Sequence, residues 1–321
     1  MKQEKEKMLA KMAYMYYVEG RTQADIAKEF NLYRTTVSRM LTQARQEGIV
    51  QIEIKNFDST LFELESYAKN KYGLTYLEVV PSADSDFEEE QNGDMFSVAA
   101  ANVIRRAVQE NQTIGVSWGA TLAKAIGKLE KKQVQNVTFI PLAGGPSHIN
   151  SQYHVNTLVY ELSRKFQGKN VFINASVVQE TAQLAEGIMQ SKYFSQIRQA
   201  WDELDVAIVG IGGPLLSGAS QWRDLLNTED YAVLQENQAV GDCCCRFFDE
   251  HGQVIQSDLY RRTIAITLEQ IKKVPVSLGI ASGKEKAKAI LALLRKKYIN
   301  SLVTDQETLL QILKEDGDEV V

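Results

Sequence analysis

Side chains able to recognise nucleic acid are concentrated between residues 23 and 45. The run YRTTVSR, residues 33–39, places hydroxyl and guanidinium groups at the start of an expected helix, where they serve no apolar core. The first side chains of a recognition helix meet base edges, while hydroxyls and backbone N–H groups meet phosphates. Arg34 or Arg39 could bind a guanine through two hydrogen bonds, which discriminates by roughly 1–3 kcal/mol. The residues expected to contact DNA are Gln23, Tyr33, Arg34, Thr35, Thr36, Ser38, Arg39 and Arg45.

A second chemical signal is the turn at residues 117–121, which in QTIGVSWGATL leads from an expected strand into a helix. Unpaired N–H groups and the positive end of the helix dipole suit a phosphate at such a helix start. The turn matches neither a Walker A loop nor GxGxxG, so no nucleotide cofactor is indicated. A tight structural turn is the alternative. The effector-binding residues expected here are Ser117, Trp118, Gly119, Ala120 and Thr121.

A lysine in the stretch LGIASGKEKAKAIL is the expected cationic partner of that phosphate. Lysine at a helix start opposes the dipole, and a bound anion would compensate for it. Lys286, in a GxxKA pattern, is interpreted as the inward-facing ammonium, with a surface-exposed Lys286 as the alternative. Lys284 and Lys288 are expected to lie in solvent.

Two glycine-bearing loops complete the predicted site. PLAGGP (141–146) and VGIGGP (209–214) place glycines where the backbone must turn sharply or approach a ligand. In an open α/β sheet, ligands bind beyond the C-terminal ends of the strands, where all these loops would gather. Asp242 is expected either to accept hydrogen bonds from sugar hydroxyls or to cap a turn, whereas His148 and His154 are interpreted as ordinary surface or packing residues. The further effector-binding candidates are therefore Gly144, Gly145, Pro146, Gly212, Asp242 and Lys286.

Several protein classes are disfavoured by the sequence. The three cysteines, residues 243–245, would point to alternate faces of a strand, so they are expected to be buried and to bind no metal. No apolar run reaches the roughly 18 residues of a membrane span, and the N-terminus lacks the apolar core of a signal peptide. No base and acid form a recognisable catalytic set. We therefore expect a cytoplasmic protein that is not an enzyme and uses no cofactor.

The first elements that must position these residues are helical. Apolar periodicity predicts helices over 5–19, from a Thr22 cap onward, and over 34–46. The segment QADIAKEFNLYRTTVSRMLTQARQEG thereby has the spacing of a helix-turn-helix, although a three-helix interaction module without a DNA role is the alternative. A strand over 49–54, a hinge near 56–60, a helix over 61–71 and an acidic loop over 81–93 are expected next.

From residue 95 onward, apolar strands alternate with amphipathic helices. Strands are predicted at 112–116, 136–140, 170–174, 205–210, 274–280 and 300–304, and helices around 95–109, 121–130, 152–166, 181–189, 284–297 and 305–314. This alternation is typical of a mostly parallel, doubly wound α/β sheet. Residues 240–263 break the pattern, and VGDCCCRFF, the turn DEHG and VIQS predict an inserted hairpin.

The charge distribution favours two domains of different character. Residues 1–55 hold 10 Lys/Arg and 7 Asp/Glu, a net +3, whereas the remaining residues hold 26 and 34, a net −8. A mildly basic head on an acidic body is compatible with DNA binding by the head. We therefore predict an all-α helix-turn-helix DNA-binding domain over 1–55 and an effector-binding and oligomerisation domain over 56–321.

Taken together, these motifs resemble the SorC/DeoR-type sugar-responsive regulators of bacteria over essentially the whole chain. The matching stretches are ADIA, TTVSRML, IGVSWGATL, AGGPSH, VGIGGP, VGDCCCRFFDEHG, ASGKEKAKAIL and NSLVTDQETL. The resemblance implies an effector domain similar to sugar-phosphate isomerases, with Ser117, Gly119, Thr121 and Lys286 at the phosphate. It also implies a homodimer or homotetramer that binds operator DNA. Ala143 carries no amine, so the sugar is expected to bind without a Schiff base.

The leading hypothesis is a transcriptional regulator of carbohydrate metabolism whose operator affinity is controlled by a phosphorylated sugar. A sugar-phosphate isomerase or deaminase with a DNA-binding head is the alternative, and turnover of a sugar phosphate would distinguish it. An oligomeric scaffold is a third reading, and it predicts no thermal shift with any sugar phosphate.

Overall fold

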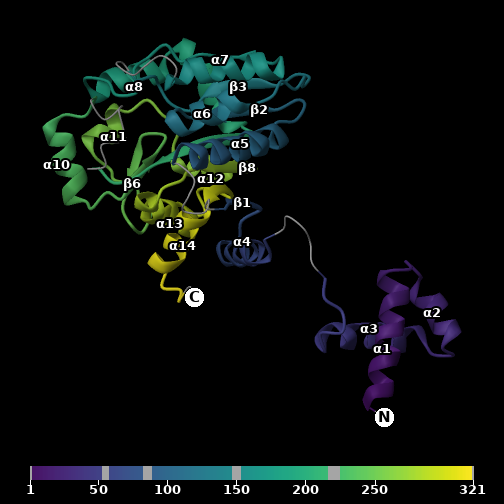
Figure 1. Ribbon diagram of the computed structural model, residues 1–321. Helices are drawn as coiled ribbons and strands as arrows, with labels where there is room; N and C mark the ends of the chain where they lie inside the picture. Colours follow the sequence, from purple (N-terminus) through teal and green to yellow (C-terminus); the bar gives the residue numbers. More distant parts are fainter. Residues whose placement is uncertain (1, 53–57, 82–88, 147–152, 216–224, 320–321) are drawn as a thin grey trace. The chain divides into compact units, whose positions relative to one another are not determined.

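The computed structural model describes residues 2–52, 58–81, 89–146, 153–215 and 225–319. The chain forms two compact units, Met1–Asp58 and Ser59–Val321, which Figure 1 draws in purple and in blue to yellow. The predicted division after residue 55 lies outside the described residues. DNA binding by the first unit, and effector binding and oligomerisation by the second, stay predictions at this point.

The N-terminal unit consists of three helices, α1 (Lys2–Tyr17), α2 (Gln23–Glu29) and α3 (Arg34–Gln46). Its core is apolar because each helix presents one hydrophobic stripe inward, for example Met12 from α1, Ile26 from α2 and Val37 from α3, all fully buried. Thr22 caps α2 as predicted, since its side chain accepts a hydrogen bond from the N–H of Asp25. Its hydroxyl also holds the pKa of the Asp25 carboxyl below its usual value.

The strand predicted over 49–54 is absent from residues 49–52. Ile49 and Val50 instead pack, half-buried, against the helical core. The N–H of Val50 donates to the carbonyl of Ala44, which folds the chain back onto α3. Residues 53 and 54 lie outside the described residues. Apolar alternation here reflects contact with a helix bundle rather than pairing with a strand.

The larger unit is built on a mostly parallel sheet, which confirms the predicted doubly wound α/β class. Its strands are β1 (Tyr76–Val80), β2 (Thr113–Val116), β3 (Thr138–Pro141), β4 (Lys169–Asn170), β5 (Val206–Gly212), β8 (Val276–Ile280) and β9 (Ser301–Asp305). Their order is β1-β9-β8-β5-β2-β3-β4, and every neighbouring pair on this path is parallel. The order in which the chain adds strands reverses between β2 and β5, because β3 and β4 lie on one side of β2 and the later strands β5, β8 and β9 lie on the other. Such a switch point is where ligands bind in open α/β sheets.

Helices cover both faces of this sheet (Figure 1). They are α4 (Ser59–Tyr72), α5 (Glu89–Ala107), α6 (Ala120–Lys128), α7 (Val155–Phe166), α8 (Ala182–Gln190), α9 (Ser195–Asp202), α10 (Thr228–Glu236), α11 (Asp258–Arg262), α12 (Leu268–Lys273), α13 (Ala287–Arg295) and α14 (Gln306–Glu315). Strand β5 shows why both faces are needed. Val206 and Ile208 join the core under α5, α6 and α7, whereas Ala207 and Val209 join the opposite core under α13 and α14.

The acidic stretch 81–93 is not entirely a loop. Helix α5 begins at Glu89, so the prediction is wrong for residues 89–93, while residues 82–88 lie outside the described part. Strand β1 and helices α9 to α12 were not predicted. The helices α11 and α12 have only five and six residues, and such short segments give little periodicity to detect.

The cysteine run is not a single strand. Strands β6 (Gly241–Cys243) and β7 (Arg246–Phe248) form an antiparallel hairpin, and β6 pairs with the end of β5. Cys244 and Cys245 make the turn with φ of 50° and 60°, the left-handed region expected of a two-residue type I′ turn. The predicted turn at DEHG is also present, closed by pairing of Phe248 with Val254. All three cysteines are buried and free, as predicted.

The side chain of Arg246 anchors this hairpin. Arg246 is 3% exposed, and its guanidinium donates to four backbone carbonyls. These are Tyr260 at 2.8 Å, Thr263 at 3.2 Å, Ala265 at 2.6 Å and Ile266 at 3.2 Å. It also lies 4.2 Å from the ring centroid of Tyr260. The hairpin is thereby fastened to the segment that follows α11.

Candidate functional site

One candidate surface lies on α3 in the N-terminal unit. Tyr33, the residue before α3, is 83% exposed, although large aromatic side chains are usually at least partly buried. Most of the predicted DNA-contacting residues are exposed, namely Tyr33, Arg34, Thr35, Ser38, Arg39 and Arg45, whereas Gln23 and Thr36 are half-buried. This surface consists of polar side chains that the core does not use.

The arginines of α3 differ from the other arginine of the unit. Arg21 forms an ion pair of 2.6 Å with Glu29. Within the described residues, Arg34, Arg39 and Arg45 form no ion pair, and α3 itself contains no acidic residue. No side chain caps α3 either. The N-terminal turn of α3 therefore offers uncompensated positive charge and unpaired N–H groups, which together suit an anion such as a DNA phosphate.

A second candidate site lies at the C-terminal ends of β2, β3, β5 and β8. These strands are parallel, so the loops that follow them gather at one edge of the sheet. The loop after β2 is tied to β5 through Ser117, whose N–H donates to the carbonyl of Ile208 at 2.9 Å. The Ser117 hydroxyl accepts from the N–H of Gly210, also at 2.9 Å. Ser117 is 2% exposed, so its first role is to join the two strands at the switch point.

The start of α6 has the features of an anion site. Gly119, which precedes the helix, has φ of 138°, a conformation that side chains rarely adopt, and a Cβ added there would meet open space. No side chain caps the helix. The backbone N–H groups of Gly119, Ala120 and Thr121 form no hydrogen bond with any other described residue. Three donors at the positive end of a helix are thus available to a phosphate.

Lys286 follows β8, on the other side of β5 from β2, in a 3-10 turn, Lys284–Lys286, at the start of α13. It is half-buried, and an added Cβ on Gly213 of the β5 loop would lie 3.0 Å from its Cγ. Burial lowers the pKa of the Lys286 ammonium, while the negative charges of Glu285, Asp242 and Asp305 oppose that shift. Among the described residues its ammonium forms no hydrogen bond or ion pair within 4 Å, although its backbone N–H donates to the carbonyl of Gly283 at 2.9 Å. A sheltered ammonium without a close partner is ready for an anionic ligand.

The neighbouring lysines behave as predicted for solvent-exposed residues. Lys284 pairs with Glu307 at 2.9 Å and Lys288 lies 3.9 Å from Glu315, with all four side chains at least 30% exposed. The turn before them is fixed separately, because the N–H of Gly283 donates to Thr308 Oγ1 at 2.8 Å. Of these three lysines, only Lys286 points inward.

The hairpin brings Asp242 to the same edge of the sheet. Asp242 pairs with Gly212 of β5, is 5% exposed, and lies close enough to Lys286 to affect its pKa. The predicted residues Gly212, Asp242 and Lys286 are therefore gathered by the fold.

The glycine pair after β3 serves packing more directly than ligand approach. An added Cβ on Gly144 would lie 2.8 Å from the carbonyl oxygens of Ala175 and Ser176, and one on Gly145 would collide with the imidazole of His154. Pro146 is also buried. These glycines allow close contact within the chain, which a local sequence pattern cannot distinguish from contact with a ligand.

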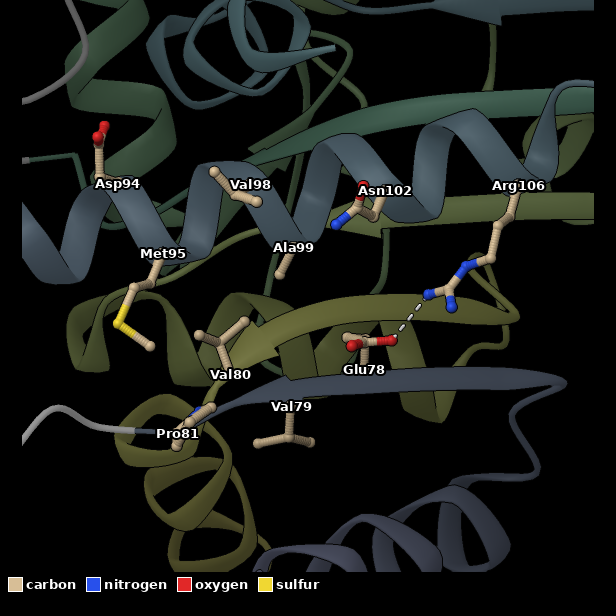
Figure 2. Close-up of a pocket in the computed structure, with 10 residues that line it drawn as sticks. All are labelled: Glu78, Val79, Val80, Pro81, Asp94, Met95, Val98, Ala99, Asn102 and Arg106. Carbon is tan, nitrogen blue, oxygen red and sulfur yellow. Dashed lines mark hydrogen bonds and ion pairs between the residues drawn. The ribbon is translucent and has the colours of Figure 1, made fainter. Parts of the chain in front are cut away.

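A further pocket of about 570 Å³ lies between α5 and β1 (Figure 2). Its lining includes Val80, Met95 and Val98 and an ion pair of 3.0 Å between Arg106 and Glu78. The only cation in this lining is thus already paired, so the pocket is a poorer match for a phosphate than the start of α6. This pocket was not predicted from the sequence, because strand β1 was not predicted and the first residues of α5, 89–93, were expected to form a loop.

The described residues lack two features, a metal-binding cluster and a membrane-spanning helix. No group of three or more His, Cys, Asp or Glu residues there could hold a metal ion. In the same part of the chain, no helix is both long and apolar enough to cross a membrane.

Comparison with known proteins places these features in context. The sugar-binding domain family, Sugar-bind, matches residues 58–314. A sorbitol operon regulator of Klebsiella pneumoniae is 36% identical over 311 residues, which cover 96% of this chain and 98% of that protein. Its full-length crystal structure, SorC, has a TM-score of 0.75 at 34% identity and covers 96% of this chain and 98% of that chain.

Two more relatives show the same similarity. A deoxyribonucleoside regulator of Bacillus subtilis (strain 168) is 30% identical over 308 residues, or 96% of this chain and 97% of that protein. A crystal structure of a transcriptional regulator from Streptococcus pneumoniae TIGR4 has a TM-score of 0.78 at 46% identity, and covers 82% of this chain and 100% of that chain.

Proposed function

This chain belongs to the SorC/DeoR-type family of sugar-binding transcriptional regulators, and we propose that α3 binds operator DNA while the loops at the switch point bind a phosphorylated sugar. Sugar binding then alters DNA affinity through a coupling free energy between the two sites. Operators are commonly read by paired recognition helices, so the active form is a homodimer or homotetramer.

The DNA-binding role is supported by three arginines on α3 that have no acidic partner in the described residues. In this proposal, Arg34 and Arg39 contact base edges, and Gln23 and Arg45 contact phosphates. The test is a selection of bound duplexes from a random pool, followed by anisotropy titration of the selected duplex. Arg34→Ala or Arg39→Ala should weaken binding about 5- to 150-fold, as expected for loss of a base contact of roughly 1–3 kcal/mol.

Lys7→Ala is the matched control, since Lys7 is exposed on α1 and its loss removes the same charge. It should change the affinity little at fixed salt. If both arginine variants bind the selected duplex as the parent does, α3 is not the recognition helix.

The effector-binding role is supported above all by the sheltered ammonium of Lys286. In this proposal it pairs with the phosphate, which also accepts hydrogen bonds from the start of α6. Asp242 accepts hydrogen bonds from sugar hydroxyls. The relatives are named for a sorbitol operon and for deoxyribonucleosides. Polyol and pentose phosphates are therefore the first ligands to test.

A thermal-shift screen of sugar phosphates tests this role. A ligand present at 100 times its dissociation constant should add about 2.7 kcal/mol to stability. Lys286→Ala should remove most of the shift, while Lys288→Ala, which removes an exposed lysine two residues away, should retain it. Equal shifts for both variants would place the phosphate elsewhere.

The enzyme alternative makes a different prediction. When the protein is incubated with the sugar phosphate that it binds, a regulator should leave that compound unchanged. An isomerase or deaminase would convert it. Chemistry of that kind needs a base and an acid within hydrogen-bond reach of the substrate. Turnover that Lys286→Ala abolishes would establish the enzyme.

A further inference from the structure

His154 packs on the loop that follows β3, the strand next to β2. It is the residue before α7 and packs over Gly145, in the loop after β3. The backbone of Gly145 is itself fixed, because its N–H donates to Ala175 at 2.9 Å and its carbonyl accepts from Val177 at 2.8 Å. The imidazole therefore rests on a rigid part of the loop.

Hydrogen bonding defines which ring nitrogen carries the proton. His154 Nδ1 accepts a hydrogen bond of 3.2 Å from the N–H of Asn156, so Nδ1 is unprotonated. In a neutral imidazole the proton then lies on Nε2, which becomes a donor. Burial lowers the pKa of this imidazole, which favours the neutral form.

The Nε2–H group has no acceptor among the described residues, although the side chain is half-buried. Buried donors usually have a partner in the protein or in ordered water, and a ligand oxygen can take the place of such a water. The Nδ1 hydrogen bond holds the ring at the start of α7, and Asn156 in turn fixes that start of the helix. That side chain donates to the carbonyl of Ile173 at 3.1 Å and accepts from its N–H at 3.2 Å.

The neighbouring strand carries the proposed phosphate site. The loop after β3 begins beside the end of β2, since the N–H of Leu142 donates to the carbonyl of Val116 at 2.9 Å. A ligand whose phosphate lies at the start of α6 would extend its sugar along this edge of the sheet. A neutral donor suits a hydroxyl or carbonyl oxygen of the sugar better than a phosphate, which Lys286 already serves.

We propose that His154 binds the sugar part of the effector, by donating its Nε2–H to a hydroxyl or carbonyl oxygen. This inference rests on the proposed effector function. It assigns His154 two separable roles: Nδ1 caps α7, and Nε2 recognises the ligand.

Two substitutions separate these roles. His154→Asn keeps an acceptor near the position of Nδ1, and asparagine is a preferred capping residue, but it removes the outer donor. His154→Gln places an amide N–H near the position of Nε2 and loses the short capping side chain. The first variant should keep the melting temperature and lose affinity, and the second should do the reverse.

The experiment is calorimetric titration of the full chain with D-sorbitol 6-phosphate, D-fructose 6-phosphate and 2-deoxy-D-ribose 5-phosphate, with competition by inorganic phosphate. For the probe that binds, His154→Asn should weaken affinity about 3- to 10-fold, which is typical of one lost hydrogen bond. His154→Gln should stay within about twofold of the parent. The affinity for inorganic phosphate should be unchanged in both variants and reduced in Lys286→Ala.

Each contrary outcome has its own meaning. Parental affinity in His154→Asn, with loss in Lys286→Ala, would overturn the role of His154 and leave the proposed function standing. Equal weakening of inorganic phosphate and sugar phosphate by His154→Asn would overturn the assignment to the sugar part. If the parent binds none of the three probes and no inorganic phosphate, the proposed effector site and this inference both fall.

Discussion

Lys286 shows how one residue can be useful for binding and costly for folding. Its ammonium is half-buried, and its closest charged influences, Glu285, Asp242 and Asp305, form no ion pair with it. Burial of a charge without a close partner disfavours the folded state. Local sequence could identify Lys286, because a GxxKA pattern after a strand is a local signal. It could not show the burial of Lys286, because residues that lie near it in the fold, such as Gly213 and Asp242, are distant in sequence.

Replacing Lys286 by methionine should therefore stabilise the unliganded protein. A side chain of similar length without the charge removes the desolvation penalty, and such changes commonly add roughly 0.5–2 kcal/mol. Urea denaturation of the larger unit should show a higher midpoint for Lys286→Met than for the parent, while stabilisation by the sugar phosphate should be lost. A lower midpoint without ligand would mean that the ammonium is well compensated in the folded state.

The stability gained in Lys286→Met should depend on pH, in a sense set by the lowered pKa of Lys286. The pKa of Lys286 is lower in the folded than in the unfolded chain, so between the two values the unfolded chain binds more protons. The stability of the parent should then rise as pH increases through the folded-state pKa. The advantage of Lys286→Met should shrink over the same alkaline range.

At the scale of elements, the β6–β7 hairpin is where sequence reasoning failed most clearly. Three adjacent cysteines carry no turn residue such as Gly, Asn or Pro, so a continuous strand was the natural prediction. The structure places Cys244 and Cys245 in the left-handed region because their side chains enter two different cores. Burial there offsets a backbone conformation that disfavours most side chains by roughly 1–2 kcal/mol per residue.

The same substitution at adjacent positions tests this arrangement. Cys244→Val should destabilise the protein by about 2 kcal/mol or more, since a β-branched residue is poorly tolerated at positive φ. Cys243→Val, on strand β6, should cost less than about 1.5 kcal/mol because valine fits an extended backbone and is similar in size. Denaturant midpoints compare the two directly, and equal costs would argue against the turn at 244–245.

Elements with strong patterns were predictable, and those defined by distant contacts were not. Strands β2, β3, β5, β8 and β9 are apolar runs between helices, so their positions followed from the sequence. Strand β1 was missed because its YLEVV is separated from the next strand by a long acidic stretch and α5. The turn at 117–119 was readable from its serine and glycine, whereas the packing of His154 over Gly145 required the fold.

At the scale of the whole molecule, two separate units must communicate for regulation to occur. The acidic larger part, at −8 by residue count after residue 55, contributes no attraction to DNA, so affinity must come from the basic head. Regulation then depends on the effector favouring one arrangement of the assembled heads over another. Thermodynamic linkage makes this coupling reciprocal.

Reciprocity gives a quantitative prediction. The factor by which the sugar phosphate changes the dissociation constant for the selected duplex should equal the factor by which the duplex changes that for the sugar phosphate, roughly 5- to 150-fold. Anisotropy provides the first factor and calorimetry the second, under identical salt. Lys286→Met should reduce both factors to about one. Unequal factors in the parent would require a third coupled equilibrium, such as a change in oligomeric state.

The four backbone carbonyls that accept hydrogen bonds from Arg246 bear on how the stability of the protein depends on metal ions in solution. Backbone carbonyl oxygens arranged around a positive charge are the means by which many proteins hold calcium and other hard cations. Here the enclosed cation is a side chain of the same polypeptide. The Arg246 guanidinium supplies the positive charge that these carbonyl oxygens face, so this part of the fold needs no metal ion from solution. The β6–β7 hairpin, and the Asp242 that it presents, should therefore be indifferent to chelators and to exchange of sodium for potassium.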